Sequence, residues 1–167
     1  MTESIDISSA LWLLMIRTFH MMRRARQREL NQYGITTRNS AVLSTIIRLG
    51  KETTLIKIAQ QLVLEDHSMS EQLSRMEKAG LIKKVKGQKR NSILIEVTRK
   101  GYELYDKGMQ GKSVGNIMSV LTKEEQQSLW TLIAKIREQS IKELGKANDN
   151  LYPPSDPAEL DPTTNVW

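Results

Sequence analysis

The chain has 167 residues, a net charge of +6 and no cysteine. This length predicts one domain with an adequate hydrophobic core, and the lack of cysteine excludes disulfides, thiolate metal sites and thiol redox chemistry. No stretch approaches the ~20 apolar residues of a membrane span, and no basic, apolar leader opens the chain, so we expect a cytoplasmic protein without membrane contact.

A long helix is predicted from residue 8 to about residue 31, because apolar side chains recur along one of its faces. Ser8 or Ser9 is its expected N-cap, and Tyr33-Gly34 ends it. The face consists of Leu11, Leu14, Met15, Thr18, Met22 and Ala25. Arginines crowd the second half of this helix, at Arg23, Arg24, Arg26 and Arg28. The sequence leaves three roles open for these arginines: solvation at the surface, pairing with acids of a second subunit, or lining an anionic ligand site.

A second helix is predicted from Thr36 or Thr37 to about Leu49, with Gly50 at its end. Two short helices follow, over residues 55–62 and 67–79, and their separation by only a few residues is typical of a helix-turn-helix. The inward face of the second of these comprises Met69, Leu73 and Met76. Gly80 stands where a left-handed residue would stop that helix.

Residues 81–98 alternate between apolar and polar side chains and predict a β-hairpin with Ile93, Ile95 and Val97 facing inward. The hairpin and its flanks contain seven cations but a single acid, Glu96. The cations are Lys83, Lys84, Lys86, Lys89, Arg90, Arg99 and Lys100. A helix-turn-helix followed by a basic hairpin is a winged helix, whose shape fits the grooves of DNA.

The C-terminal part begins with a predicted helix from about Arg99, which continues irregularly to Val120. Three glycines weaken that helix and mark either a kink or a close backbone approach, at Gly108, Gly111 and Gly115. Thr122 and Glu125 form a capping box that opens a last helix to about Lys146. Its apolar stripe consists of Leu129, Leu132, Ile133, Ile136 and Leu144.

The tail over residues 148–167 contains four acids, all four prolines and no cation. Two interpretations remain open. An acidic, extended or disordered segment is favoured by the prolines. Alternatively, the tail docks on a partner subunit through its larger apolar side chains, which are Leu151, Tyr152, Val166 and Trp167.

The predicted fold is therefore mostly α, an α+β winged helix with six helices and a two-stranded β-wing. We divide the chain into an N-terminal dimerisation helix (1–34), a winged helix-turn-helix DNA-binding core (35–101), C-terminal dimerisation helices (102–147) and the tail. Amphipathic helices at both ends of a small domain most simply bury their stripes against a second copy, and two-fold symmetry suits palindromic DNA. A homodimer through the terminal helices is the expected assembly.

Three stretches carry a family resemblance: residues 55–62, the run L-x-R-M-E-K-x-G-L-I at residues 73–82, and V-T-x-K-G at residues 97–101. In these stretches, and in its helix order over residues 8–146, the chain resembles the MarR family of bacterial transcriptional regulators. The resemblance implies an obligate homodimer on pseudo-palindromic DNA, typically a repressor relieved by a small ligand. Two features depart from the family: the wing tip reads Lys-Arg-Asn at residues 89–91, and Glu71 stands where a basic or neutral residue is common.

We predict that the second short helix contacts DNA through the face opposite its inward residues. The residues of this face are His67, Ser68, Ser70, Glu71, Ser74, Arg75 and Lys78. Glu71 either accepts a hydrogen bond from cytosine or simply lowers the affinity for phosphates. The predicted wing contacts are Lys86, Gln88, Lys89, Arg90 and Asn91, and the predicted backbone contacts are Arg38 and Lys57. The alternative for each is an ordinary solvated surface residue.

The family resemblance implies a ligand pocket that lies between the first helix, the second helix and the helix after the wing. The matching residues are Trp12, Ile16, His20, Tyr33 and Tyr105. Aromatic and apolar walls with a few polar groups suit a small aromatic or acyl effector. Core or dimer packing is the favoured alternative for Trp12 and Ile16.

Enzyme chemistry finds no support in the sequence, which shows no metal-ligand spacing, no phosphate-binding loop and no nucleophile elbow. We therefore expect no catalytic site, no metal and no cofactor. The second functional hypothesis is a winged helix used only for protein contacts, and the acids of the predicted recognition helix favour it. Salt-dependent DNA affinity distinguishes this hypothesis from a DNA-binding regulator.

Overall fold

The computed structural model describes residues 6–88, 92–145 and 151–160. Within these ranges the α-helices are α1 (Ile7–Leu30), α2 (Thr37–Leu49), α3 (Leu55–Gln61), α4 (Asp66–Lys78), α5 (Arg99–Met109), α6 (Ser113–Met118) and α7 (Lys123–Glu143). The strands β1 (Ile82–Lys86) and β2 (Ile93–Val97) form an antiparallel hairpin. The winged helix predicted from the sequence is confirmed, and α6 is a separate short helix where an irregular continuation of α5 was expected.

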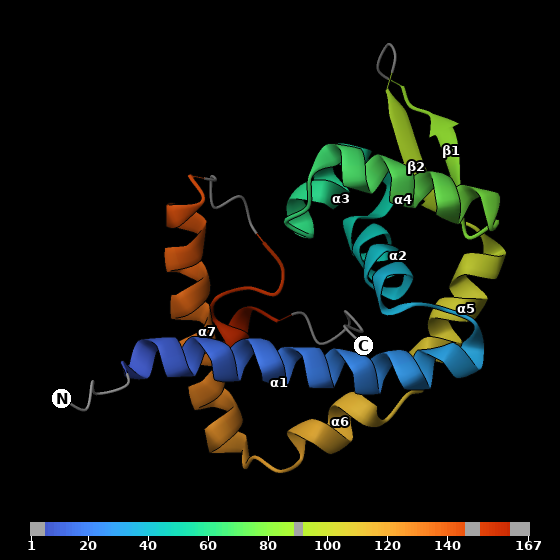
Figure 1. Cartoon of the computed structure of the whole chain (residues 1–167). Helices are drawn as coiled ribbons and strands as arrows, with labels where there is room; N and C mark the ends of the chain where they lie inside the picture. Colours follow the sequence, from blue (N-terminus) through green and yellow to red (C-terminus); the bar gives the residue numbers. More distant parts are fainter. Residues whose placement is uncertain (1–5, 89–91, 146–150, 161–167) are drawn as a thin grey trace.

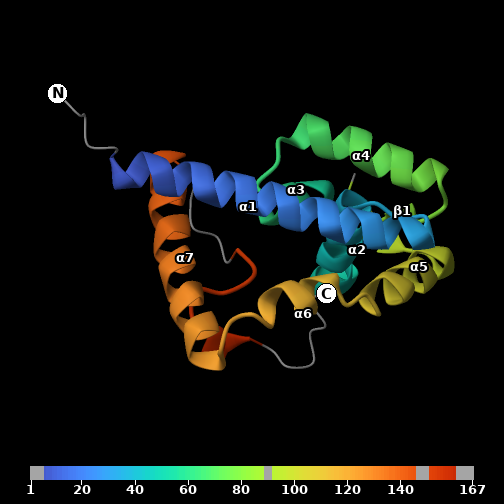
Figure 2. The ribbon, with the colours of Figure 1, turned by 60° about the horizontal axis from the view of Figure 1, so that its bottom comes forward.

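The winged helix and the terminal helices occupy different regions of the molecule (Figure 1). Helices α2, α3 and α4 and the two strands stand over the C-terminal half of α1, whereas α7 lies toward its N-terminal half. Figure 2 shows α5 and α6 leading from the winged helix back to α7. The N-terminal half of α1 and the whole of α7 thus extend away from the winged helix, and we call them together the arm.

Most helices begin at a side chain that caps them. Thr36, Thr54 and Thr98 accept hydrogen bonds at the starts of α2, α3 and α5, and Thr122 forms the predicted capping box with Glu125. The start of α1 differs from the prediction: Asp6 is its N-cap and accepts from the backbone N–H groups of residues 8 and 9. A carboxylate two positions before the first serine reaches both of these otherwise unpaired N–H groups at once.

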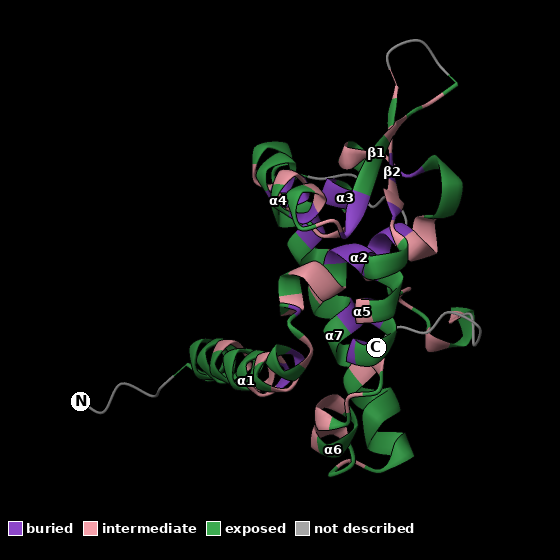
Figure 3. Ribbon diagram, turned by 90° about the vertical axis from the view of Figure 1, so that its right-hand side faces the viewer, coloured by how far each residue is buried: buried purple, intermediate pink, exposed green. Residues whose placement is uncertain are grey.

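The hydrophobic core lies beneath the wing (Figure 3) and joins α2, α3, α4, α5 and both strands. Met69, Leu73 and Met76 are at most 1% exposed, as their spacing predicts. The wing corrects one expectation, because Ile95 and Val97 are buried but Ile93 is 57% exposed. Ile93 pairs with Lys86 at the outer end of the hairpin, beyond the reach of the core.

Much of the arm is exposed in the single chain (Figure 3), and its exposed residues include large apolar ones. They are Leu11, Trp12, Leu13, Leu14 and Phe19 on α1, and Leu129, Leu132, Ile133, Ile136 and the nearby Leu144 at α7. Contiguous exposed apolar surface of this kind marks an interaction site. In the described ranges, no helix combines the length and apolar character needed to cross a membrane.

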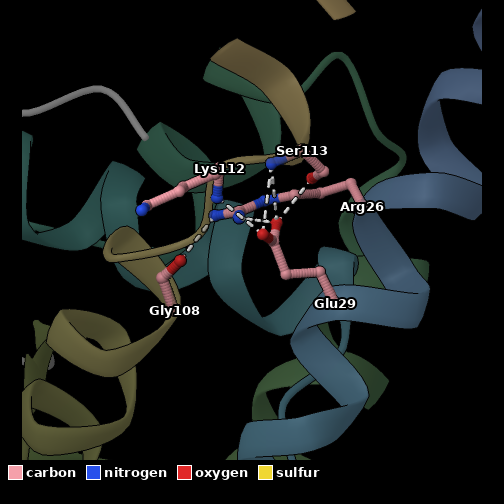
Figure 4. A network of polar contacts seen from close by, with 5 residues as sticks. All are labelled: Arg26, Glu29, Gly108, Lys112 and Ser113. Atoms are coloured by element: carbon pink, nitrogen blue, oxygen red, sulfur yellow. Dashed lines mark hydrogen bonds and ion pairs between the residues drawn. The ribbon is translucent and has the colours of Figure 1, made fainter. Parts of the chain in front are cut away.

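A partly buried ionic network ties α1 to the junction between α5 and α6 (Figure 4). Nη1 of Arg26 donates to Glu29 at 2.7 Å, and Nη2 donates to the carbonyl oxygen of Gly108 at 2.8 Å. Glu29 also accepts from the backbone N–H of Lys112 at 2.6 Å and from the hydroxyl of Ser113 at 2.5 Å. The network therefore fixes the C-terminal half of α1 against the segment that leaves the winged helix.

The protonation of Glu29 reflects this network. Burial alone would raise the pKa of its carboxyl group, but hydrogen bonds from Ser113, from Arg26 and from the backbone of Lys112 outweigh burial and lower the pKa to about 2. A Cβ atom at Gly111 would collide with both Arg26 and Glu29. This glycine marks a close approach to the backbone, one of the two roles considered for it from the sequence.

The C-terminal segment differs from the favoured expectation of a disordered tail over the residues that the structure describes. Residues 151–160 run between α7 and the helix-turn-helix (Figure 1). On α7, Nε1 of Trp130 donates to the carbonyl oxygen of Ser155 at 2.9 Å, and Nη2 of Arg137 donates to its hydroxyl at 2.8 Å. The remainder of the tail, including Val166 and Trp167, lies outside the described residues.

Candidate nucleic-acid interface

Helix α4 presents a polar face on the side opposite its buried methionines. His67, Ser70, Glu71, Arg75 and Lys78 are exposed on this face, and Ser68 and Ser74 are half-buried. The structure thus brings together the recognition-helix residues that the sequence singled out. Short hydroxyl side chains between long charged ones let the helix backbone approach base edges closely.

Glu71 lies between the two best donors of this face. Its Oε1 is 3.2 Å from Nε2 of His67, and its Oε2 is 3.7 Å from Nη1 of Arg75. A guanine that accepts from Arg75 must compete with this carboxylate, whereas a cytosine amino group can donate to it. The arrangement supports a role for Glu71 in base discrimination.

A chain of hydrogen bonds connects α2 with α4. Nη2 of Arg38 donates to the hydroxyl of Ser68 at 2.7 Å. Further along, Nε2 of Gln72 donates to Asn39 at 2.5 Å, and Arg75 donates to Oε1 of Gln72 at 3.1 Å. These bonds orient the Arg75 guanidinium from the interior of the motif.

Gln72 is a residue that the sequence interpretation missed, since it was not assigned to either face of the recognition helix. It is only 6% exposed. The signal was present, because Gln72 follows Met69 by three residues and therefore lies on the same side of the helix. A polar side chain at such a position is buried when it finds partners, as this one does in Asn39 and Arg75.

The wing carries fewer unpaired cations than its composition indicates. Lys83 pairs with Glu96 and Lys84 pairs with Glu77, both at 2.8 Å, while Lys86 and Gln88 are exposed. The other predicted wing contacts, Lys89, Arg90 and Asn91, lie outside the described residues. On α3, the exposed Lys57 donates from Nζ to the carbonyl oxygen of Glu52 at 3.0 Å.

The five residues predicted for a ligand pocket do not surround one cavity of a single chain. Trp12 is 62% exposed and His20 is exposed on α1, Ile16 is half-buried, and Tyr105 belongs to the core. Tyr33 alone lines a hollow, of about 380 Å³, between α1 and the α5–α6 segment. At 1.5 Å per residue, Trp12 is about 27 Å from the end of α1, which separates it from Tyr33. Periodicity identified the helix face but not this distance from the core.

Comparisons with known proteins agree with this architecture. No protein-family model matches the chain. An uncharacterised helix-turn-helix-type transcriptional regulator of Bacillus cereus is 27% identical over 139 residues, which cover 81% of this chain and 92% of the relative. The organohalide-sensing transcriptional regulator RdhR, solved ligand-free and with 2,4-dichlorophenol, is 29% identical with a TM-score of 0.81, and the match covers 90% of each chain.

A third comparison concerns the fold alone. A mutant of MarR from E. coli, solved in complex with operator DNA, is 19% identical with a TM-score of 0.73, over 81% of this chain and 99% of that one. Helix order, wing and sequence thus agree over nearly the whole length of these proteins. The chain is thus similar, in helix order, wing and sequence, to winged helix-turn-helix transcriptional regulators such as those of the MarR family.

Proposed function

We propose that the chain is a sequence-specific regulator of transcription that binds double-stranded DNA as a homodimer. The observation that carries this proposal is the exposed polar face of α4, supported from behind by buried methionines and flanked by the wing. A helix of this kind enters the major groove and reads base edges, while neighbouring cations hold phosphates. The net charge of +6 suits such a polyanionic partner.

We infer dimerisation from the exposed apolar residues of the arm. Leu132 and Ile133 on α7 are 58% and 49% exposed in the single chain, and Trp12 on α1 is 62% exposed. A second copy that covers both helices would bury these side chains and place two α4 helices about a two-fold axis. Such a pair matches a pseudo-palindromic operator, whose half-sites lie about 34 Å apart or a multiple of it.

Regulation by a small molecule is the finer part of the proposal. The relative RdhR was solved with 2,4-dichlorophenol, and we infer that this chain is a repressor that responds to a small aromatic or acyl effector. The exposed Trp12 and His20 and the half-buried Ile16 on α1 would contribute to such a site together with the second subunit. We do not propose an enzyme, because the relatives are transcriptional regulators. We propose a cytoplasmic location because the proposed partner is DNA.

A gel-shift experiment tests the proposal. The duplex is the intergenic DNA upstream of the chain's own gene, with a scrambled duplex of equal length as competitor. We expect a shift that the scrambled duplex does not remove and that weakens steeply with salt. Ser70→Glu, at the centre of the exposed face of α4, should abolish the shift, whereas Ser119→Glu, at an exposed position after α6, should not. Binding that is equally weak for both duplexes would instead support the protein-interaction module.

A further inference from the structure

A second hollow, of about 410 Å³, opens between α1, α2 and α4 beside the DNA-contacting face. Three arginines line it, and each comes from a different helix: Arg23 from α1, Arg38 from α2 and Arg75 from α4. The other residues that line it are neutral: Gln27, Thr36, Thr37, Asn39, Gln72 and Met76. The walls therefore combine three positive charges with hydrogen-bonding side chains and no carboxylate.

Several of these groups are fixed by contacts within the protein. Arg38 donates to Ser68, and Arg75 donates to Gln72, which is itself bonded to Asn39. On the opposite wall, Oε1 of Gln27 accepts from the backbone N–H of Thr37 at 2.9 Å, which attaches α1 to the first turn of α2. The carboxylate of Glu71 lies near one of these arginines, with Oε2 at 3.7 Å from Nη1 of Arg75, but Glu71 does not line the hollow.

The chemistry of the walls selects the occupant. Guanidinium groups bind phosphates through paired hydrogen bonds, and three of them around one hollow favour a group with several acceptor oxygens. The first turn of α2 also opens into the hollow, and the N-terminal end of a helix attracts anions. A phosphate group matches the three guanidinium groups and the helix N-terminus in charge and in hydrogen-bond acceptors. An uncharged aromatic compound offers the three arginines no negative charge.

The position of the hollow identifies the source of that phosphate. Arg75 belongs both to the hollow and to the exposed face of α4, and phosphates border the groove that such a helix enters. We infer that the hollow holds a backbone phosphate of the operator and that Arg23 reaches this phosphate from α1. The inference rests on the proposed DNA binding and adds a contact from a helix assigned only to dimerisation.

This contact has a geometric consequence. Arg23 lies one turn of α1 before Arg26, which the partly buried network with Glu29 fixes to the α5–α6 junction. A displacement of α1 relative to α4 would separate Arg23 from Arg38 and Arg75, so the phosphate could no longer meet all three. The hollow therefore makes the DNA affinity sensitive to the placement of α1 relative to α4.

The test compares two variants that remove the same charge from adjacent positions of α1. Arg23→Gln removes a wall of the hollow, and Arg24→Gln removes an exposed arginine that does not line it. Operator affinity is measured by fluorescence anisotropy between about 50 and 200 mM salt. Because a dimer would lose two phosphate contacts, the slope of log K against log [salt] should fall in magnitude by about 2 for Arg23→Gln and stay unchanged for Arg24→Gln. The affinity lost across this salt range should then be about 10-fold smaller in Arg23→Gln than in the wild type.

Each contrary result has a distinct meaning. If the wild type binds its operator and both variants keep its slope, the hollow does not hold a backbone phosphate, and the proposed function stands. Equal reductions in the two variants would assign the effect to the general charge of α1 and overturn the site. If the wild type ignores DNA at low salt, the proposed function itself fails.

Inorganic phosphate separates a DNA phosphate from a free anion. Competition by inorganic phosphate at constant ionic strength that is weaker for Arg23→Gln than for the wild type supports a shared site. Binding of inorganic phosphate that leaves the operator affinity of the wild type unchanged would overturn the assignment to the DNA backbone.

Discussion

The guanidinium carbon of Arg48 on α2 lies 4.4 Å from the centre of the Tyr152 ring. Arg48 also donates to Oε1 of Gln61 at 2.7 Å, and the same oxygen accepts the backbone N–H of Tyr152 at 3.1 Å. Because Ser155 is held by two side chains of α7, residues 151–160 bridge the arm and the helix-turn-helix. The C-terminal segment thus stabilises the position of one unit relative to the other.

Replacement of Tyr152 by Ala should weaken this bridge. The lost cation–π contact and the lost packing of a half-buried ring predict a decrease of about 1–2 kcal/mol in the free energy of unfolding and faster proteolytic cleavage after residue 145. Tyr152→Phe, which keeps the ring over Arg48, is the matched control and should behave like the wild type. Chemical denaturation and limited proteolysis provide the measurements, and equal values for Ala and the wild type would show that the segment does not dock.

Glu29 predicts a pH-dependent contribution to stability. Its pKa is lowered from 4.5 to about 2 in the folded chain. A carboxyl group whose folded-state pKa is depressed stabilises the fold above its unfolded-state pKa, and this contribution is lost as the pH falls from about 4.5 toward 2. The difference in unfolding free energy between the wild type and Glu29→Gln should therefore be largest near neutral pH and shrink below pH ~4.5.

The control for this experiment is Glu143→Gln, at an exposed position at the end of α7. It should leave both the stability near neutral pH and its acid dependence close to those of the wild type. A difference between wild type and Glu29→Gln that stays constant from neutral to acid pH would contradict the role assigned to the carboxylate.

These two cases also indicate where prediction from sequence succeeded and where it stopped. The caps at Thr36 and Thr122, the stop at Gly80 and the inward face of α4 follow from spacing within one element, so the sequence contains the information. Arg26 binds Gly108, 82 residues away, and Gln61 binds Tyr152, 91 residues away. Contacts of this range depend on the folded topology, which explains why the arginine cluster remained ambiguous and the tail was expected to be disordered.

Leu132 provides a test of dimerisation. A carboxylate at this exposed position of α7 would be buried without a partner in a dimer interface, which is strongly unfavourable. Leu132→Glu should therefore sediment as one chain where the wild type sediments as two, and it should lose operator affinity. Gln127→Glu introduces the same charge on the opposite face of α7 and should remain dimeric. A wild type that sediments as one chain would contradict the proposed assembly.

Glu71 should act on specificity more than on affinity. Glu71→Gln removes a negative charge near the phosphates and releases His67 and Arg75, so the affinity for any duplex should rise a few-fold. It also replaces the charged acceptor for cytosine with a neutral amide that accepts more weakly and can donate as well, so the ratio of operator to scrambled affinity should fall by about 10-fold. Glu65→Gln, one residue before α4, should raise both affinities without changing their ratio. An unchanged ratio in Glu71→Gln would show that Glu71 does not read a base.

The central claim is that two copies of this chain place their α4 helices in the major groove on either side of a two-fold axis. Sedimentation velocity of the chain with a labelled duplex of its upstream DNA, at about 50 mM salt, measures this directly. We predict a complex of two chains on one pseudo-palindromic site, without a stable complex of one chain. A single chain bound per site, or no complex at this salt concentration, would contradict the claim.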